Sequence, residues 1–148
     1  MILIKIEQKV AATSIQVRDT LLDHEQLNRF FNAEFLLVQA EDQGEIQGGK
    51  GAIRQVSMLG NRFQERIISA NEQHISYQII GNKPVANHQG DIYLSEDTSS
   101  PQPITHIQYH ISCTAPWWQP NFLVKHFITK DISQALNKIA TLFSGDKT

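Results

Sequence analysis

The hydrophobic pattern changes its period near residue 115, and this change constrains the fold more than any other feature of the sequence. Between Phe35 and Thr114, short runs of alternating apolar and polar residues are separated by Gly, Asn and Pro, which is typical of antiparallel strands joined by turns. After Pro120, apolar residues recur at steps of three and four, which predicts one long amphipathic helix that ends near Gly145. The strands are expected near residues 35–41, 51–59, 62–70, 74–80, 90–95 and 104–114.

The first ten residues also have the pattern of a strand. Residues 2–10 alternate between an apolar side and a charged side that carries Lys5, Glu7 and Lys9, as expected of a strand with one face in water. A secretory signal would instead need a basic start, an apolar stretch and a small-residue cleavage site. We therefore expect a cytoplasmic protein.

Two short helices are expected between this strand and the next. Thr13 and Gln16 have the spacing of a capping box, in which a hydroxyl and an amide satisfy helix N–H groups reciprocally. This spacing predicts a helix over about residues 14–22. Asp23 is suited to be a second N-cap and predicts a further helix over residues 25–31. The apolar stripe of the final helix then has the concave side of the sheet as its partner.

The length and composition exclude several classes of protein. A chain of 148 residues favours a single domain, here residues 1–148, and is long enough to bury a sizeable core. The formal net charge of -2 lacks the basic surplus of a nucleic-acid binder, and no apolar run approaches the roughly 18 residues of a membrane span. The single cysteine, Cys113, excludes a disulfide framework within one chain and a zinc site built from several thiolates.

The order of the expected elements and several short motifs resemble the START-like superfamily. One strand, two short helices, six antiparallel strands and a long final helix is the order of its helix-grip fold, an α+β fold whose curved antiparallel sheet wraps around the carboxy-terminal helix. The motifs resemble the polyketide cyclase/dehydrase-like (SRPBCC) branch, and they are VRDTLLD at 17–23, GAIR at 51–54, QERI at 64–67, YQIIG at 77–81 and the final helix. The resemblance implies a deep apolar cavity between sheet and helix, which the superfamily uses for lipids, sterols, polyketides, quinones and plant hormones. Some members are cyclases or hydrolases, and many only bind or carry.

A hairpin in the middle of the chain places two charged residues on one face. Gly60 allows a two-residue turn in two registers, which set Arg54 either directly opposite Glu65 or diagonal to it. The alternation along the second strand of the hairpin puts Glu65 on the apolar face with Phe63 and Ile67. We therefore expect an Arg–Glu pair inside an apolar cup, because a lone buried charge costs several kcal/mol.

Two roles for this pair stay open. In one, Arg54 and Glu65 fix the strand register and hold the shape of the cavity. In the other, Arg54 also donates hydrogen bonds to a ligand carboxylate, enol or carbonyl while Glu65 orients it. Tyr77 and Tyr109 share the inward faces of their strands, where their hydroxyls either form a polar tip at the cavity wall or bond to a backbone carbonyl.

The histidines and the recognisable motifs predict neither a metal site nor a cofactor. His106 and His110 have a spacing that chelates zinc on a helix, but on a strand it leaves them roughly 13 Å apart on the polar face. The sequence has no Ser-His-Asp order with supporting context, no Gly-rich phosphate loop and no HExxH motif.

Trp117 and Trp118 stand between two prolines just before the long helix. The resemblance puts this segment near one end of the cavity. There the two indoles roof the ligand site, seal the core or form a surface for a partner, and the sequence leaves these three roles open.

Three functional hypotheses follow. The first is a protein that binds or carries a small hydrophobic molecule. The second is a cyclase or dehydratase that acts on a polyketide-like carbonyl compound, with Glu65 or Tyr77 as acid or base and Arg54 stabilising enolate charge. The third is a helper that binds an apolar segment of another protein. Whether the chain is an enzyme, and its oligomeric state, stay open. The expected cavity residues are Arg54, Glu65, Ile4, Phe63, Ile67, Tyr77, Ile92, Tyr109 and Phe127, with Trp117 and Trp118 as further candidates for ligand binding.

Overall fold

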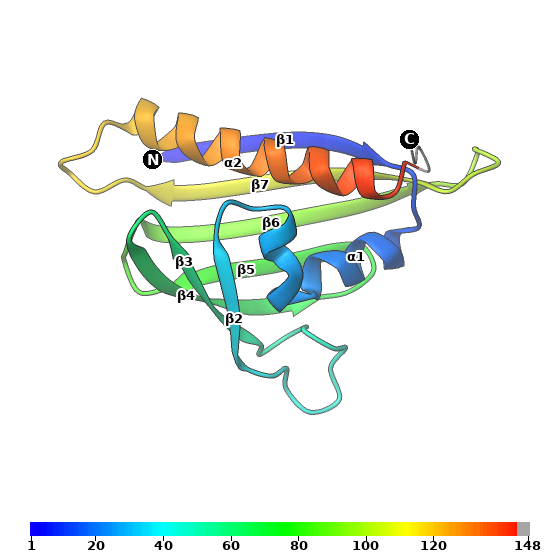
Figure 1. Cartoon of the computed structure of the whole chain (residues 1–148), viewed down its shortest axis with the longest axis horizontal. Helices are drawn as coiled ribbons and strands as arrows, with labels where there is room; N and C mark the ends of the chain where they lie inside the picture. The colour runs from blue at the N-terminus through cyan, green and yellow to red at the C-terminus, as the bar shows by residue number, and fades with distance from the viewer. Residues whose placement is uncertain (145–148) are drawn as a thin grey trace.

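Residues 1–144, which the computed structural model describes, form a seven-stranded antiparallel sheet with helices on one face (Figure 1). The strand order is β1-β7-β6-β5-β4-β3-β2, so successive strands from β2 to β7 are neighbours and β1 closes the edge beside β7. The elements are β1 (Ile2–Val10), α1 (Ser14–Leu22), the 3-10 helix η1 (His24–Arg29), β2 (Glu34–Gln39), β3 (Ile53–Met58), β4 (Asn61–Ala70), β5 (His74–Ile80), β6 (Ala86–Asp97), β7 (Ile104–Thr114) and α2 (Asn121–Leu142).

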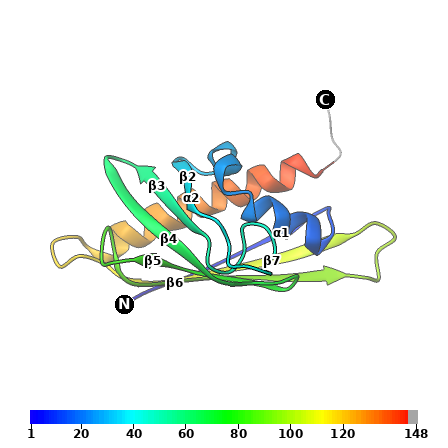
Figure 2. The same cartoon turned by 90° about the horizontal axis from the view of Figure 1, so that it is seen from below.

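The long helix and the short helical segments cover the concave side of the sheet. Figure 2 shows α2 crossing above the strands, with α1 beside its carboxy-terminal half and with β3 and β4 rising toward the helices at the other end. The core between the layers combines side chains from α1, the sheet and α2, among them Val17, Leu21, Ile75, Ile107, Leu136 and Ile139. The predicted α+β class, with a curved sheet around a carboxy-terminal helix, is confirmed.

The segment after β1 follows the prediction with one correction. Thr13 Oγ1 accepts a hydrogen bond from the N–H of Gln16 at 3.1 Å, and Gln16 Oε1 accepts one from the N–H of Thr13 at 2.9 Å, so the capping box opens α1 as expected. The second short helix, expected over 25–31, is present as the 3-10 helix η1 over His24–Arg29. Asp23, expected as its N-cap, makes no side-chain capping hydrogen bond and is also the C-cap of α1.

The start of β6 is the strand boundary that differs most from the prediction. β6 begins at Ala86 because a bulge, with Asn87 at a φ of 52°, lets the strand start before the glycine at which it was expected to begin. The N-cap of α2 is Pro120. α2 ends at Leu142, and Gly145, the expected end of the helix, lies outside the described residues. Like every other helix within residues 1–144, α2 lacks the combination of length and apolar character that crossing a membrane requires.

The β3–β4 hairpin has the first of the two registers that the sequence allows. Leu59 and Gly60 both have positive φ angles, of 50° and 78°, as a two-residue type I′ turn requires. This turn sets Arg54 directly opposite Glu65. Both side chains are buried on the concave side of the sheet, which confirms the predicted pair and the face on which it lies.

Candidate functional site

A cavity of about 470 Å³ lies between the sheet and the first half of α2. Its walls are mainly apolar and come from strands β2 to β7, from α2 and from the segments that join them. The apolar wall residues include Phe35, Val56, Phe63, Ile79, Val85, Ile111, Leu123, Val124, Phe127 and Ile128. The polar wall residues include Arg54, Glu65, Tyr77, His88, Tyr109 and Asp131.

The cavity occupies one half of the concave side, and the packed core occupies the other. On β4, Glu65 lines the cavity, whereas Ile67 is 1% exposed in the core. On β7 the same border falls between Tyr109, which lines the cavity, and Ile107, which is 0% exposed. The core half is filled by α1 and the second half of α2. Arg54 and Glu65 therefore lie at the end of the cavity that adjoins the core, which we call its inner end.

Most of the residues expected to bind a ligand lie in the cavity wall, and ligand binding by them stays a prediction. Arg54, Glu65, Phe63, Tyr77, Tyr109 and Phe127 line the cavity. The expected place of Ile4, Ile67 and Ile92 in its wall is corrected, because all three pack in the core. Alternation along a strand shows which face a side chain occupies, but it does not show which half of that face the helices fill.

Trp117 and Trp118 lie outside the cavity wall. They are 95% and 64% exposed in the loop between β7 and α2, which projects beyond the sheet in Figure 1. The next two residues, Gln119 and Pro120, do line the cavity, so the loop borders its open end. Such exposure is incompatible with sealing the core, and the roles of roof and partner surface stay predictions.

The ion pair between Arg54 and Glu65 is buried, with 7% and 8% of the two residues exposed. Arg54 Nε donates a hydrogen bond to Glu65 Oε1 at 2.8 Å, and NH2 lies 2.7 Å from the same oxygen. Burial by itself lowers the pKa of Arg54, but the carboxylate of Glu65 and the phenols of Tyr77 and Tyr109 together outweigh burial, and the net pKa lies above the usual value. The guanidinium also lies over the rings of Phe35 and Tyr77. Arg54 is thus held in place from several sides.

His24 hydrogen-bonds to Arg54 of the pair, and the sequence did not suggest this contact. Its Nδ1 accepts a hydrogen bond from Arg54 NH1 at 3.2 Å, and its Nε2 donates to the carbonyl of Gly48 at 2.8 Å. Burial and the adjacent charge of Arg54 lower the pKa of His24 to about 4, so the ring is neutral at pH 7. The one sign of this contact in the sequence is the glycine at position 48. A Cβ there would come within 2.3 Å of the carbonyl of Leu22, so a glycine is needed where the two segments approach closely.

The lowered pKa of His24 predicts a loss of stability in acid. The unfolded chain protonates this histidine below a pH of about 6.5, whereas the folded chain resists protonation down to a pH of about 4. The stabilising contribution is therefore complete above pH 6.5 and falls by about 3 kcal/mol as the pH drops to 4. Urea unfolding at several pH values should show this slope in wild type and a flatter one in His24→Gln, whose amide can keep both hydrogen bonds.

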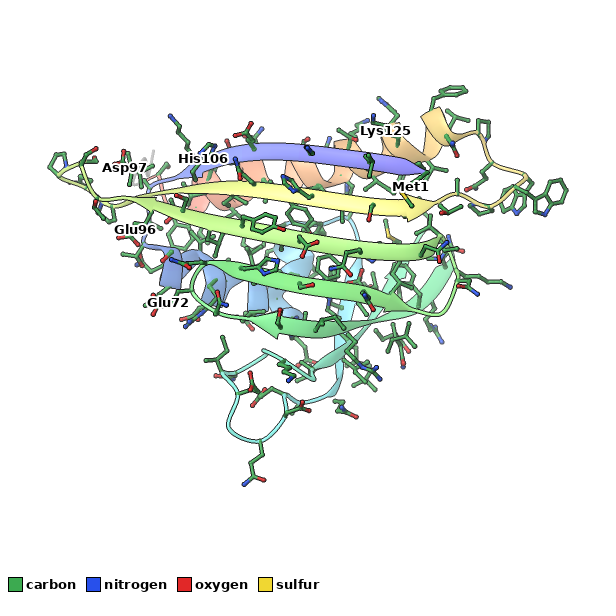
Figure 3. All side chains as sticks on the ribbon, turned by 180° about the vertical axis from the view of Figure 1, so that it is seen from behind. Met1, Glu72, Glu96, Asp97, His106 and Lys125 are labelled. Atoms are coloured by element: carbon green, nitrogen blue, oxygen red, sulfur yellow. The ribbon has the colours of Figure 1, made fainter. Side chains whose placement is uncertain are left out.

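A matched control separates His24 from the other histidines. His106 lies on the outer face of the sheet (Figure 3), where its Nε2 is 2.9 Å from Glu7 Oε1. The variant His106→Gln should keep the wild-type slope. A slope in His24→Gln as steep as that of wild type would contradict the assignment to His24.

Two tyrosines complete the inner end of the cavity. The hydroxyls of Tyr77 and Tyr109 are 2.5 Å apart and share a hydrogen bond. Burial raises the pKa of both phenols, so both stay neutral at physiological pH. The ring of Tyr77 lies over Gly90, its register partner on β6, where an added Cβ would come within 2.4 Å of the ring. The two hydroxyls bond to each other and not to a backbone carbonyl, and both tyrosines line the cavity.

His88 and Asp131 are cavity residues that the sequence did not suggest. His88 Nδ1 accepts a hydrogen bond from the N–H of Ile79 at 3.2 Å, and burial holds the pKa of His88 below its usual value. Asp131 Oδ1 accepts one from the N–H of Asn32 at 3.3 Å, and burial raises the pKa of Asp131. His88 faces inward because of the bulge in β6, which strict alternation cannot reveal.

Solved structures with the same arrangement of strands and helices identify the fold. A START superfamily protein from Mycobacterium smegmatis matches with a TM-score of 0.76 and 12% sequence identity, over 96% of this chain and 97% of that chain. The chain has the START-like helix-grip fold. The protein XoxI from Bacillus cereus is similar over 98% of this chain and 97% of its own, with a TM-score of 0.73 and 16% identity. A protein from Thermobifida fusca is similar over 96% of this chain and 93% of its own, with a TM-score of 0.71 and 15% identity.

The START-like likeness is a likeness of fold. No family model and no curated protein matches the sequence, and the solved structures share few identical residues with it. The resemblance to the START-like superfamily is thereby confirmed for the fold, and the polyketide cyclase/dehydrase-like branch stays a prediction.

Proposed function

We propose that this START-like protein binds or carries a small, mostly apolar molecule in the cavity between the sheet and α2. The observation that carries the proposal is the cavity itself, whose volume of about 470 Å³ falls within the range of roughly 300–1,000 Å³ of small-molecule sites. Apolar walls with a few convergent polar groups at one end are the usual composition of such sites. A cytoplasmic location remains part of the proposal.

Binding is better supported than catalysis. A cyclase or dehydratase needs a titratable group that is free to exchange a proton with substrate. Arg54 engages only Oε1 of Glu65, so the ion pair alone does not decide against a catalytic carboxylate, whereas the phenols of Tyr77 and Tyr109 are bonded to each other. The helper hypothesis has only the exposed Trp117 and Trp118 in its support.

Native mass spectrometry tests the proposal on protein purified from cells. We expect an added mass of one small molecule per chain that is lost on denaturation. If the preparation has lost its ligand, an excess of the neutral apolar probe N-phenyl-1-naphthylamine should add one probe per chain. A bare chain before and after addition of the probe would contradict the proposal.

A further inference from the structure

Glu65 keeps a hydrogen-bond acceptor that no described residue uses. Both contacts from Arg54 go to Oε1, and Oε2 has no bonding partner within residues 1–144. In the same part of the chain, no fully buried side-chain nitrogen or oxygen lacks a partner. Oε2 must therefore be reachable from the cavity that Glu65 lines. Because an ionised carboxylate only accepts hydrogen bonds, its natural complement in a ligand is a donor.

His88, which lines the same cavity as Glu65, supplies a donor. Its Nδ1 accepts the N–H of Ile79, and Ile79 is the register partner of Glu65, so the three residues lie on adjacent strands. The lowered pKa of His88 keeps its ring neutral, and the proton then resides on Nε2. Within the described chain Nε2 has no partner of its own. A second donor comes from the Tyr77–Tyr109 pair, because its mutual hydrogen bond uses only one of the two hydroxyl protons.

The charges at the inner end disfavour an anion. Arg54 is the only lysine or arginine among the described residues that line the cavity, and Glu65 already balances its charge. Asp131 brings a second carboxyl to the wall, and His126, the remaining histidine of the wall, is exposed. A carboxylate ligand would meet two acids and no unmatched buried cation. A headgroup that only accepts hydrogen bonds would also leave Glu65 Oε2 without a donor.

We propose that the cavity selects an uncharged ligand that carries a hydroxyl group, an alcohol or a phenol. The ligand O–H donates to Glu65 Oε2, and the ligand oxygen accepts from His88 Nε2–H or from the spare tyrosine hydroxyl. This inference rests on the proposed function, since it requires a ligand in the cavity.

Three probes with one apolar body and different headgroups test the selection. They are 4-pentylphenol, which donates and accepts, 4-pentylanisole, which only accepts, and 4-pentylbenzoate, which is an anion. Dissociation constants come from displacement of N-phenyl-1-naphthylamine at pH 8. We expect the phenol to bind about tenfold more tightly than either other probe, because each of these leaves the carboxylate oxygen unpaired. Equal affinities for the three probes would overturn the inference and leave the proposed function standing. Failure of all four compounds to bind would overturn both.

Charge variants show whether the acids cause the selection. Glu65→Gln leaves the charge of Arg54 unmatched, and the preference for phenol over benzoate should fall by about tenfold. Asp131→Asn keeps the acceptor for the N–H of Asn32 and should fold whether or not Glu65→Gln does. It should tighten benzoate binding about threefold and leave phenol binding unchanged. Glu72→Gln is the control, because Glu72 is exposed at the opposite end of the sheet from the β7–α2 loop (Figure 3). Preferences in Asp131→Asn equal to those of Glu72→Gln would overturn the inference.

Discussion

Replacing Arg54 with leucine should cost about 3–5 kcal/mol of the free energy of unfolding. The variant Arg54→Leu leaves the carboxylate of Glu65 buried without the cation that now lies 2.7 Å away. It also removes the donor to His24 Nδ1. Glu65→Leu should cost a similar amount, because it leaves the guanidinium unmatched. Urea unfolding measures both losses.

The double variant separates the interaction energy of the Arg54–Glu65 pair from the effects of the two single substitutions. Arg54→Leu with Glu65→Leu removes both charges together, and leucines of similar volume can pack in their place, so it should be more stable than either single variant. Arg62→Leu, at an exposed position of the same hairpin, should change stability by no more than about 0.5 kcal/mol. Additive losses in the double variant would contradict a coupled buried pair. Lost stability in Arg54→Leu with unchanged affinity for the apolar probe would count against a role of Arg54 in ligand binding.

The pair illustrates what the sequence determines locally. Arg54 and Glu65 are joined by one tight hairpin, and period-two alternation fixes the face of each side chain once the turn is known. The capping box of Thr13 and Gln16 is likewise a contact over three residues. Contacts of this range could be predicted because few alternative geometries exist for them.

The contacts around the pair depend on segments that are far apart in the chain. His24 meets Arg54 across 30 residues and Gly48 across 24, and the segment that carries Gly48 has no regular period. His88 owes its inward direction to a bulge, which shifts the alternation by an amount that the sequence pattern does not reveal. At the polar end of the cavity, the sequence therefore predicted the Arg54–Glu65 pair and the two inward-facing tyrosines, but neither His24 nor His88.

The extent of the cavity also could not be predicted from the sequence. The apolar stripe of α2 is continuous in the sequence, yet Ile139 is fully buried in the core, whereas Leu123 lines the cavity and is half exposed. The difference arises because α1 fills the space beside one half of α2 only. A periodic pattern identifies an amphipathic helix, but it cannot show where a second helix leaves the space beneath it empty.

Filling the cavity should weaken binding at least about tenfold without unfolding the protein. Val124 lies on the first turn of α2 and lines the cavity, so the indole of Val124→Trp would occupy space that a ligand needs. Lys125, the next residue, is exposed and lies outside the described wall. Lys125→Trp therefore adds the same indole to the same turn and leaves the cavity open.

Titration of wild type and these two variants with N-phenyl-1-naphthylamine is the most direct measurement of the central claim. Wild type and Lys125→Trp should bind one probe per chain with equal affinity. Val124→Trp should bind it at least about tenfold more weakly, the equivalent of about 1.4 kcal/mol, with thermal unfolding showing that it remains folded. Equal probe affinity in a folded Val124→Trp would contradict the claim that the molecule binds its ligand in this cavity.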